Sequence, residues 1–173
     1  MFRLLLIRHA EAEARTKQGD LARPLTKRGR ADAIRLGNYC AASCLIPELA
    51  VTSPALRARE TLDAVGGKFL QKPVCKIEEL LYDSDLETLC DILQGISASV
   101  KTLMMVGHNP GLAEFARFLI GGEASTPLIH FPAPCLALIG FARGDWGEAA
   151  RGGGQLERFM NFSCEPADNL LAR

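Results

Sequence analysis

Short apolar runs alternate along the chain with longer segments in which apolar and polar residues recur at helical spacing. The runs at 2–7 and 101–106 are almost continuously apolar, as buried parallel strands are. Shorter or less regular runs predict further strands at 49–52, 73–77, 135–141 and 156–162. The pattern therefore predicts six strands.

Helical periodicity fills most of the intervals between these strands. The predicted helices cover about 26–44, 54–66, 84–95 and 112–119. Ser53 and Pro54 are predicted to cap and open the second helix. Ser84, with a glutamate three residues later, predicts a capping box at the start of the third. The polar, glycine-rich stretch 143–154 is predicted to be a surface connection.

The order of these elements predicts an α/β fold. Strands that alternate with helices form a mainly parallel central sheet with helices on both faces, joined by right-handed crossovers. The last two strands have no helix between them, which predicts one antiparallel edge strand. The length of 173 residues fits one domain. We therefore expect a single-domain three-layer sandwich over residues 1–173.

Composition and charge narrow the class of protein. The 20 Lys and Arg balance the 20 Asp and Glu, so no net charge attracts the chain to nucleic acid or to a membrane surface. No apolar run reaches the roughly 18–20 residues of a membrane span, and no signal peptide is expected. The six cysteines show no CxxC pair and predict reduced, mostly buried thiols. A cytoplasmic location is expected.

Groups that suit phosphate chemistry lie where predicted strands end, and α/β sheets bind their ligands at that edge. Arg8 and His9 leave the first strand, His108 leaves the strand at 101–106, and Arg57 lies in the helix that follows 49–52. Guanidinium groups and helix N-termini bind phosphoryl oxygens, and a neutral imidazole can act as a nucleophile. Three histidines without a carboxylate at ligand spacing predict no catalytic metal.

Four motifs, in order along the chain, resemble the histidine phosphatase superfamily, which includes cofactor-dependent phosphoglycerate mutase. They are LLIRHA at 5–10, RPLTKRG at 23–29, SPALRARET at 53–61 and VGHNPG at 106–111. The short chain, the GHNPG turn and the segment 141–146 are most similar to the SixA-type phosphohistidine phosphatases. The resemblance covers about residues 3–146 and, with four ordered motifs, is more specific than any single pattern.

The resemblance implies a role for each matching residue. His9 would be the nucleophile that becomes phosphohistidine, and Arg8 and Arg57 would clamp the phosphoryl group. His108 would hold the phosphoryl oxygens and stabilise the transition state. Arg23 is a further candidate for substrate binding, although a solvated surface arginine is an equal alternative.

The chain departs from larger members of the family in its general acid. Those members place a carboxylic acid after the third strand or beside the second histidine, where this chain has Asn109, a further candidate for substrate binding. Glu78, Glu79, Asp83 and Asp85 lie near the first region, and spacing selects none of them. Such a site favours a leaving group that needs little help, such as the nitrogen of phosphohistidine.

The sequence thus predicts a phosphatase that uses neither metal nor cofactor and acts through a phospho-His9 intermediate. A phosphohistidine-bearing protein is the leading substrate. The alternatives are a phosphatase of small phosphate esters or anhydrides and, from another class, a non-catalytic phosphohistidine-binding module. Neither nucleic acid nor a membrane is expected as a partner. The chain lacks a cysteine-phosphatase loop, a GxSxG elbow and a GxxxxGK[ST] loop, so those enzyme classes are excluded.

Overall fold

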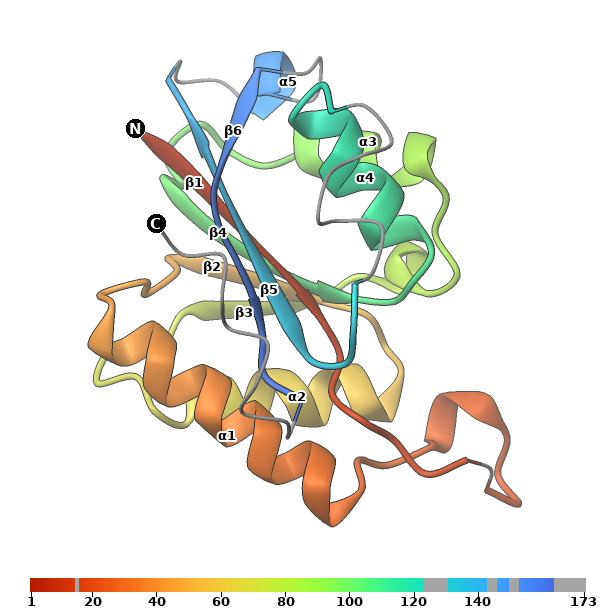
Figure 1. The fold of residues 1–173 in the computed structure, drawn as a ribbon. Coiled ribbons are helices and arrows are strands. Elements are labelled where there is room, and N and C mark those ends of the chain that lie inside the picture. The colour runs from red at the N-terminus through yellow and green to blue at the C-terminus, as the bar shows by residue number, and fades with distance from the viewer. Residues whose placement is uncertain (15, 123–130, 143–145, 150–152, 164–173) are drawn as a thin grey trace.

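Six strands form one sheet with helices on both faces (Figure 1). The computed structural model describes residues 1–14, 16–122, 131–142, 146–149 and 153–163. The strand order is β3-β2-β4-β1-β5-β6. The strands are β1 (Phe2–Arg8), β2 (Leu49–Thr52), β3 (Val74–Ile77), β4 (Thr102–Gly107), β5 (Cys135–Phe141) and β6 (Gly154–Asn161).

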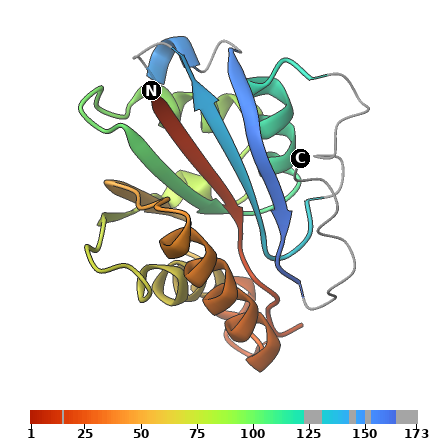
Figure 2. The same cartoon turned by 60° about the vertical axis from the view of Figure 1, so that its left-hand side comes forward.

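Strand direction confirms the predicted fold class. β3, β2, β4 and β1 run parallel to one another. β5 pairs antiparallel with β1, and β6 pairs antiparallel with β5, so the antiparallel pairing lies at one edge of the sheet. Figure 2 shows this edge, with β1 in red beside the two blue strands. Every predicted strand is present to within two residues at each end.

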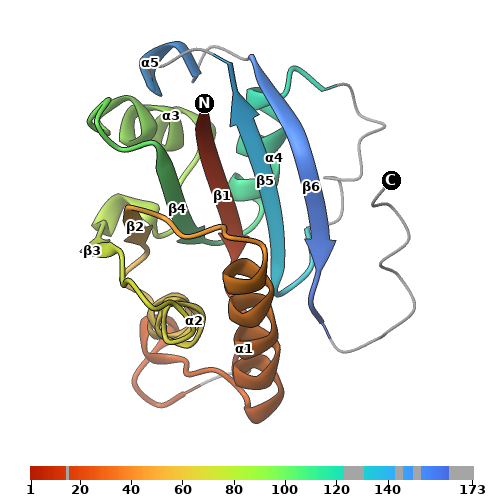
Figure 3. The same cartoon turned by 90° about the vertical axis from the view of Figure 1, so that its left-hand side faces the viewer.

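Two pairs of helices cover the two faces of the sheet (Figure 3). They are α1 (Lys27–Ala42) and α2 (Leu56–Gly66) on one face, and α3 (Leu86–Gln94) and α4 (Gly111–Leu119) on the other. Successive side chains of a strand point to opposite faces, so Leu5 and Ile7 pack in the core under α1 and α2, whereas Leu4 and Leu6 pack under α3 and α4. Two cores thus fix β1 from both sides.

Two predicted helix starts are wrong. α2 begins at Leu56, with Ala55 as its N-cap, and the hydroxyl of Ser53 accepts from the Ala55 amide at 3.3 Å and contacts a histidine. α3 is capped by Asp85, whose carboxylate accepts a hydrogen bond from the Thr88 amide at 2.9 Å. The sequence pattern placed both helices correctly but chose the wrong capping residues.

The stretch 143–154 is more than a surface connection. Its residues 146–149 form a short helix, α5 (Trp146–Ala149), and Trp146 is fully buried. The indole ring packs edge-on against Phe2 and Phe141, and its N–H donates to the carbonyl of Val100 at 2.9 Å. The only tryptophan of the chain therefore closes the core at the end of the sheet opposite the histidines.

The cysteines match the prediction only in part. Cys40 and Cys135 are buried, Cys90 is partly buried, and Cys44 and Cys75 are exposed. These five cysteines are free thiols, and the sixth lies outside the described residues. None of the helices in the described part of the chain has the length and hydropathy needed to cross a bilayer.

Candidate active site

Parallel pairing of β1 with β4 brings the two predicted histidines together. Arg8 lies opposite Gly107 in this register, and His9 and His108 are the next residues of their chains. The backbone N–H of His9 donates to the carbonyl of Gly107 at 3.1 Å. The two imidazole rings lie 5.0 Å apart between centroids and are tilted by 57°. The carboxyl edge of the sheet thus forms a site with two imidazoles, as the sequence predicts.

Backbone hydrogen bonding fixes the tautomer of His9. Nδ1 lies 2.7 Å from the carbonyl oxygen of Ala10, which can only accept, so Nδ1 carries the proton. Nε2 then presents a lone pair, and the Nε–H of Arg57 points at it from 3.3 Å. The atom of His9 that faces the arginine is therefore unprotonated and accepts the hydrogen bond from Arg57.

Both imidazoles are held in the neutral form. Burial, together with the positive charges around it, lowers the pKa of His9 to about 3. Burial, and next the charge of Arg57, lowers the pKa of His108 to about 4. A hydrogen bond 2.8 Å long joins Nε2 of His108 to the hydroxyl of Ser53 at the end of β2. Neutral imidazoles at physiological pH are the form that nucleophilic catalysis requires.

Arg57 reaches the site from the first turn of α2. Its side chain is only 7% exposed, although it carries a charge. Thr61, one turn later on the same helix, is fully buried and donates to the Arg57 carbonyl at 2.7 Å. The same hydroxyl accepts from the backbone N–H of Ala10 at 3.0 Å. This threonine ties the helix that carries the arginine to the segment that carries His9.

Arg8 and Asn109 meet at one backbone carbonyl. Arg8 Nη1 donates to the carbonyl of Phe131 at 2.7 Å, and the side-chain amide of Asn109 donates to the same oxygen at 2.9 Å. Burial lowers the pKa of Arg8. Among the described residues, its buried Nε has no hydrogen-bond partner, and neither has Nδ1 of His108. A buried guanidinium donor without a partner is suited to an anionic ligand.

Asp20 and Tyr82 join the site, and the sequence pattern singled out neither of them. Asp20 opens a 3₁₀ turn, η1 (Asp20–Ala22), between β1 and α1. Its carboxylate accepts from Arg57 at 2.9 Å, from Arg23 at 2.8 Å and from the Tyr82 hydroxyl at 2.8 Å. The Tyr82 ring lies edge-on to His108, with centroids 5.6 Å apart. Arg23 therefore contacts the site through Asp20 rather than standing free at the surface.

The four carboxylates considered as general acids lie after β3 and before α3. Glu78 forms an ion pair with Lys76 at 2.8 Å, which lowers the pKa of this carboxyl. Asp85 caps α3, and Glu79 and Asp83 are exposed. The structure shows no feature that selects one of them as a proton donor. Asp20 is the carboxylate that contacts Arg57, and its hydrogen bonds hold its pKa well below the usual range.

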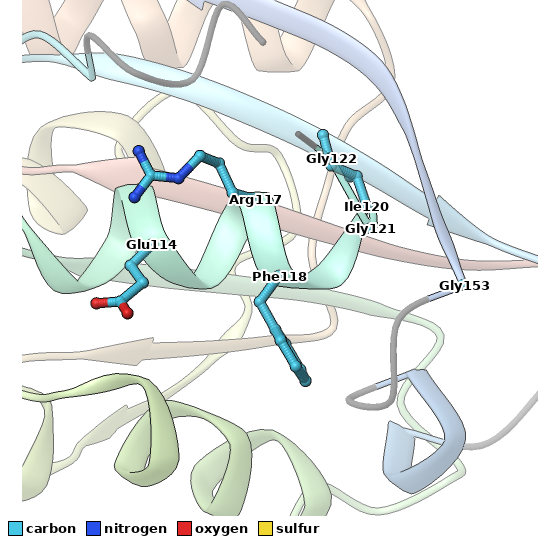
Figure 4. A pocket seen from close by; sticks show the side chains of 7 residues that line it. All are labelled: Glu114, Arg117, Phe118, Ile120, Gly121, Gly122 and Gly153. Atoms are coloured by element: carbon cyan, nitrogen blue, oxygen red, sulfur yellow. The ribbon is translucent and has the colours of Figure 1, made fainter. Parts of the chain in front are cut away.

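A hollow elsewhere in the described chain lacks the histidines of this site. This hollow of about 760 Å³ lies along α4, lined by Glu114, Arg117 and Phe118 and by glycines (Figure 4). None of its lining residues is a histidine, a cysteine or a serine. Over the described residues, no three His, Cys, Asp or Glu side chains are grouped so that they could hold a metal ion.

The fold and the paired histidines define a histidine phosphatase. A family model described as the histidine phosphatase superfamily (branch 1) matches residues 4–87. An uncharacterized chloroplastic protein of Arabidopsis thaliana is 32% identical over 157 residues, which cover 85% of this chain and 70% of that protein. The chain belongs to the histidine phosphatase superfamily and is a phosphatase.

Within the superfamily, the chain is SixA-like. It superposes with a TM-score of 0.81 on the putative phosphohistidine phosphatase SixA of Nakamurella multipartitia, with 25% identity over 92% of this chain and 95% of that chain. The corresponding protein of Agrobacterium tumefaciens gives a TM-score of 0.78 and 25% identity, over 92% of this chain and 97% of that chain.

Proposed function

We propose that this phosphatase removes phosphoryl groups from phosphohistidine in a protein and carries them transiently on Nε2 of His9. One observation carries the proposal: His9 holds its proton on Nδ1, so the lone pair of Nε2 faces the Arg57 guanidinium. The likeness to two structures described as putative phosphohistidine phosphatases supports the substrate class. The cytoplasmic location and the identity of the partner stay predictions.

The reaction would proceed in two displacements. Nε2 of His9 attacks phosphorus, the bond from phosphorus to the substrate nitrogen breaks, and its electron pair returns to the substrate imidazole. Water then attacks the phosphoryl group on His9, and the bond from phosphorus to Nε2 breaks. Its electron pair returns to Nε2, both protons of the water stay on the inorganic phosphate, and the neutral imidazole is restored. Arg8, Arg57 and His108 would stabilise the charge on the phosphoryl oxygens in both steps.

The leaving group explains why this site needs no strong acid. An imidazole that carries a proton on its distal nitrogen leaves phosphorus as a neutral molecule, with a pKa near that of free histidine. An alkoxide leaving from a phosphate ester is far more basic and needs a proton donor. Asn109 follows His108 directly and cannot donate a carboxylic proton. These residues therefore support a substrate with a phosphorus–nitrogen bond.

Rapid quenching with a radiolabelled phosphohistidine protein tests this proposal. We expect an acid-labile, base-stable label on the wild-type chain and none on H9A. R59A is the matched control, because Arg59 is an exposed arginine of the same helix as Arg57, and it should label like the wild type. Binding without label or phosphate release would point to a non-catalytic module. Turnover of small phosphate esters alone would assign the other class of substrate.

A further inference from the structure

We propose that Asp20 is a positioning residue that reserves one edge of the Arg57 guanidinium for the phosphoryl group; this inference rests on the proposed roles of His9 and Arg57. A guanidinium has five N–H groups in one plane, and four of them form two forks. One fork consists of Nη1 and Nη2, and the other consists of Nε and the second hydrogen of Nη2. The two forks face different directions.

Asp20 occupies the first of these forks. Nη1 of Arg57 donates to the backbone carbonyl of Asp20 at 2.8 Å, and Nη2 donates to its carboxylate at 2.9 Å. The other fork remains directed toward His9, with Nε 3.3 Å from Nε2 of the imidazole. A phosphoryl group bonded to Nε2 would therefore meet Nε–H and the second Nη2–H without displacing Asp20.

The carboxylate of Asp20 is itself fixed in place. Arg23 donates to Oδ1 at 2.8 Å, and the hydroxyl of Tyr82 donates to Oδ2 at 2.8 Å. These donors hold the pKa of Asp20 far below its usual range, so the carboxylate stays charged at every working pH. Asp20 is 46% exposed on its side chain, whereas Arg57 is 7% exposed. A partly exposed carboxylate thus orients a buried arginine.

This geometry distinguishes a carboxylate that orients Arg57 from one that competes with the phosphoryl group for it. A carboxylate that merely stood in for phosphate would occupy the fork that faces His9, and its removal would strengthen anion binding. Asp20 occupies the opposite fork, so its removal lets the guanidinium rotate away from the nucleophile. A displacement of about 1 Å in a clamp of this kind can cost about 100-fold in rate. D20A should therefore weaken both oxyanion binding and turnover.

A double-mutant cycle between Asp20 and Arg57 tests the inference. Tungstate binding is measured by calorimetry, and kcat and KM are measured with a phosphohistidine protein, for the wild type, D20A, R57A and D20A/R57A. We expect D20A to lower kcat/KM by about 10- to 100-fold and to cause little further loss when R57A is already present. D20N keeps an oxygen acceptor for Nη2 and should recover part of the loss. D63A, which removes an exposed carboxylate from α2, is the control.

Several outcomes would overturn the inference. Equal fold-losses from D20A with and without R57A would mean that Asp20 does not act through this arginine. Tighter tungstate binding by D20A would mean that the carboxylate competes with the ligand. Urea unfolding of each variant shows whether a loss reflects the fold alone. Tungstate binding requires no turnover, so it tests Asp20 even if the quenching experiment rejects phosphohistidine as the substrate.

Discussion

Acidification from pH 7.5 to pH 5 should destabilise this protein through its two active-site histidines. In the unfolded chain a histidine titrates near pH 6.5. Folding lowers the pKa of His9 to about 3 and that of His108 to about 4, with burial as the largest cause in both. Between these values and pH 6.5 the unfolded chain binds more protons than the folded chain. The free energy of unfolding therefore falls as the pH falls through this window.

The size of the effect follows from the same values. A pH of 5 is about 1.5 units below the pKa of a histidine in the unfolded chain, and one unit corresponds to about 1.4 kcal/mol. Each imidazole therefore costs about 2 kcal/mol of stability at pH 5, and both together cost about 4 kcal/mol as an upper bound. Asp20 acts in the same direction but in a more acidic window: its lowered pKa stabilises the fold above about pH 4, and this contribution is lost as the pH falls further.

Urea unfolding at the two pH values measures this linkage. The wild type should lose stability between pH 7.5 and pH 5, and H9Q should lose about 2 kcal/mol less, since glutamine does not titrate. H108Q should show a similar reduction. Exposed histidines would keep pKa values near 6.5 and contribute nothing to this difference. If H9Q and the wild type lost equal stability on acidification, the buried neutral imidazole would be refuted.

Two further predictions concern packing. W146A should lower the free energy of unfolding by about 3–5 kcal/mol, because it removes a fully buried ring and leaves the backbone carbonyl of Val100 without its donor. Chemical denaturation measures this loss, and a loss below about 1 kcal/mol would contradict the prediction. G29A should destabilise the chain because its Cβ would overlap the carbonyl oxygen of Glu11, whereas G66A, which meets no atom within 4 Å, should be neutral or stabilising by up to about 1 kcal/mol. Equal melting temperatures for the two glycine variants would be the contrary result.

The sheet and its four site residues were predictable because they depend on local signals. Buried parallel strands are short apolar runs, and such runs stand out in this sequence. Arg8, His9 and His108 lie at or directly after the ends of β1 and β4, where α/β sheets place ligands. Arg57 lies one turn after β2, at the start of a helix with clear periodicity. Position relative to a strand end was sufficient to predict that these four residues lie at the same edge of the sheet.

Site residues that do not lie at the end of a strand could not be found in the same way. Asp20 lies in a turn without periodicity, 37 residues before its partner Arg57. Tyr82 lies 62 residues after Asp20, and no local pattern relates the two. Ser53 carried a local signal, but the signal is ambiguous, because a serine before a proline suits an N-cap as well as a histidine partner. Only the tertiary packing shows that Ser53 contacts His108.

The groups gathered at the candidate site are costly for the fold. Two neutral imidazoles and two guanidinium groups lie in or beside the interior, and burial disfavours the charged form of each histidine. A sequence selected for stability alone would have residues at these positions that do not titrate. The glutamine of H9Q is such a residue, and it should avoid the loss of stability at pH 5. The two cores that pack on either face of β1 are what hold Arg8 and His9 in place against this cost. Burial favours the proposed chemistry all the same, because it lowers the pKa of His9 and so favours the neutral imidazole that a nucleophile requires.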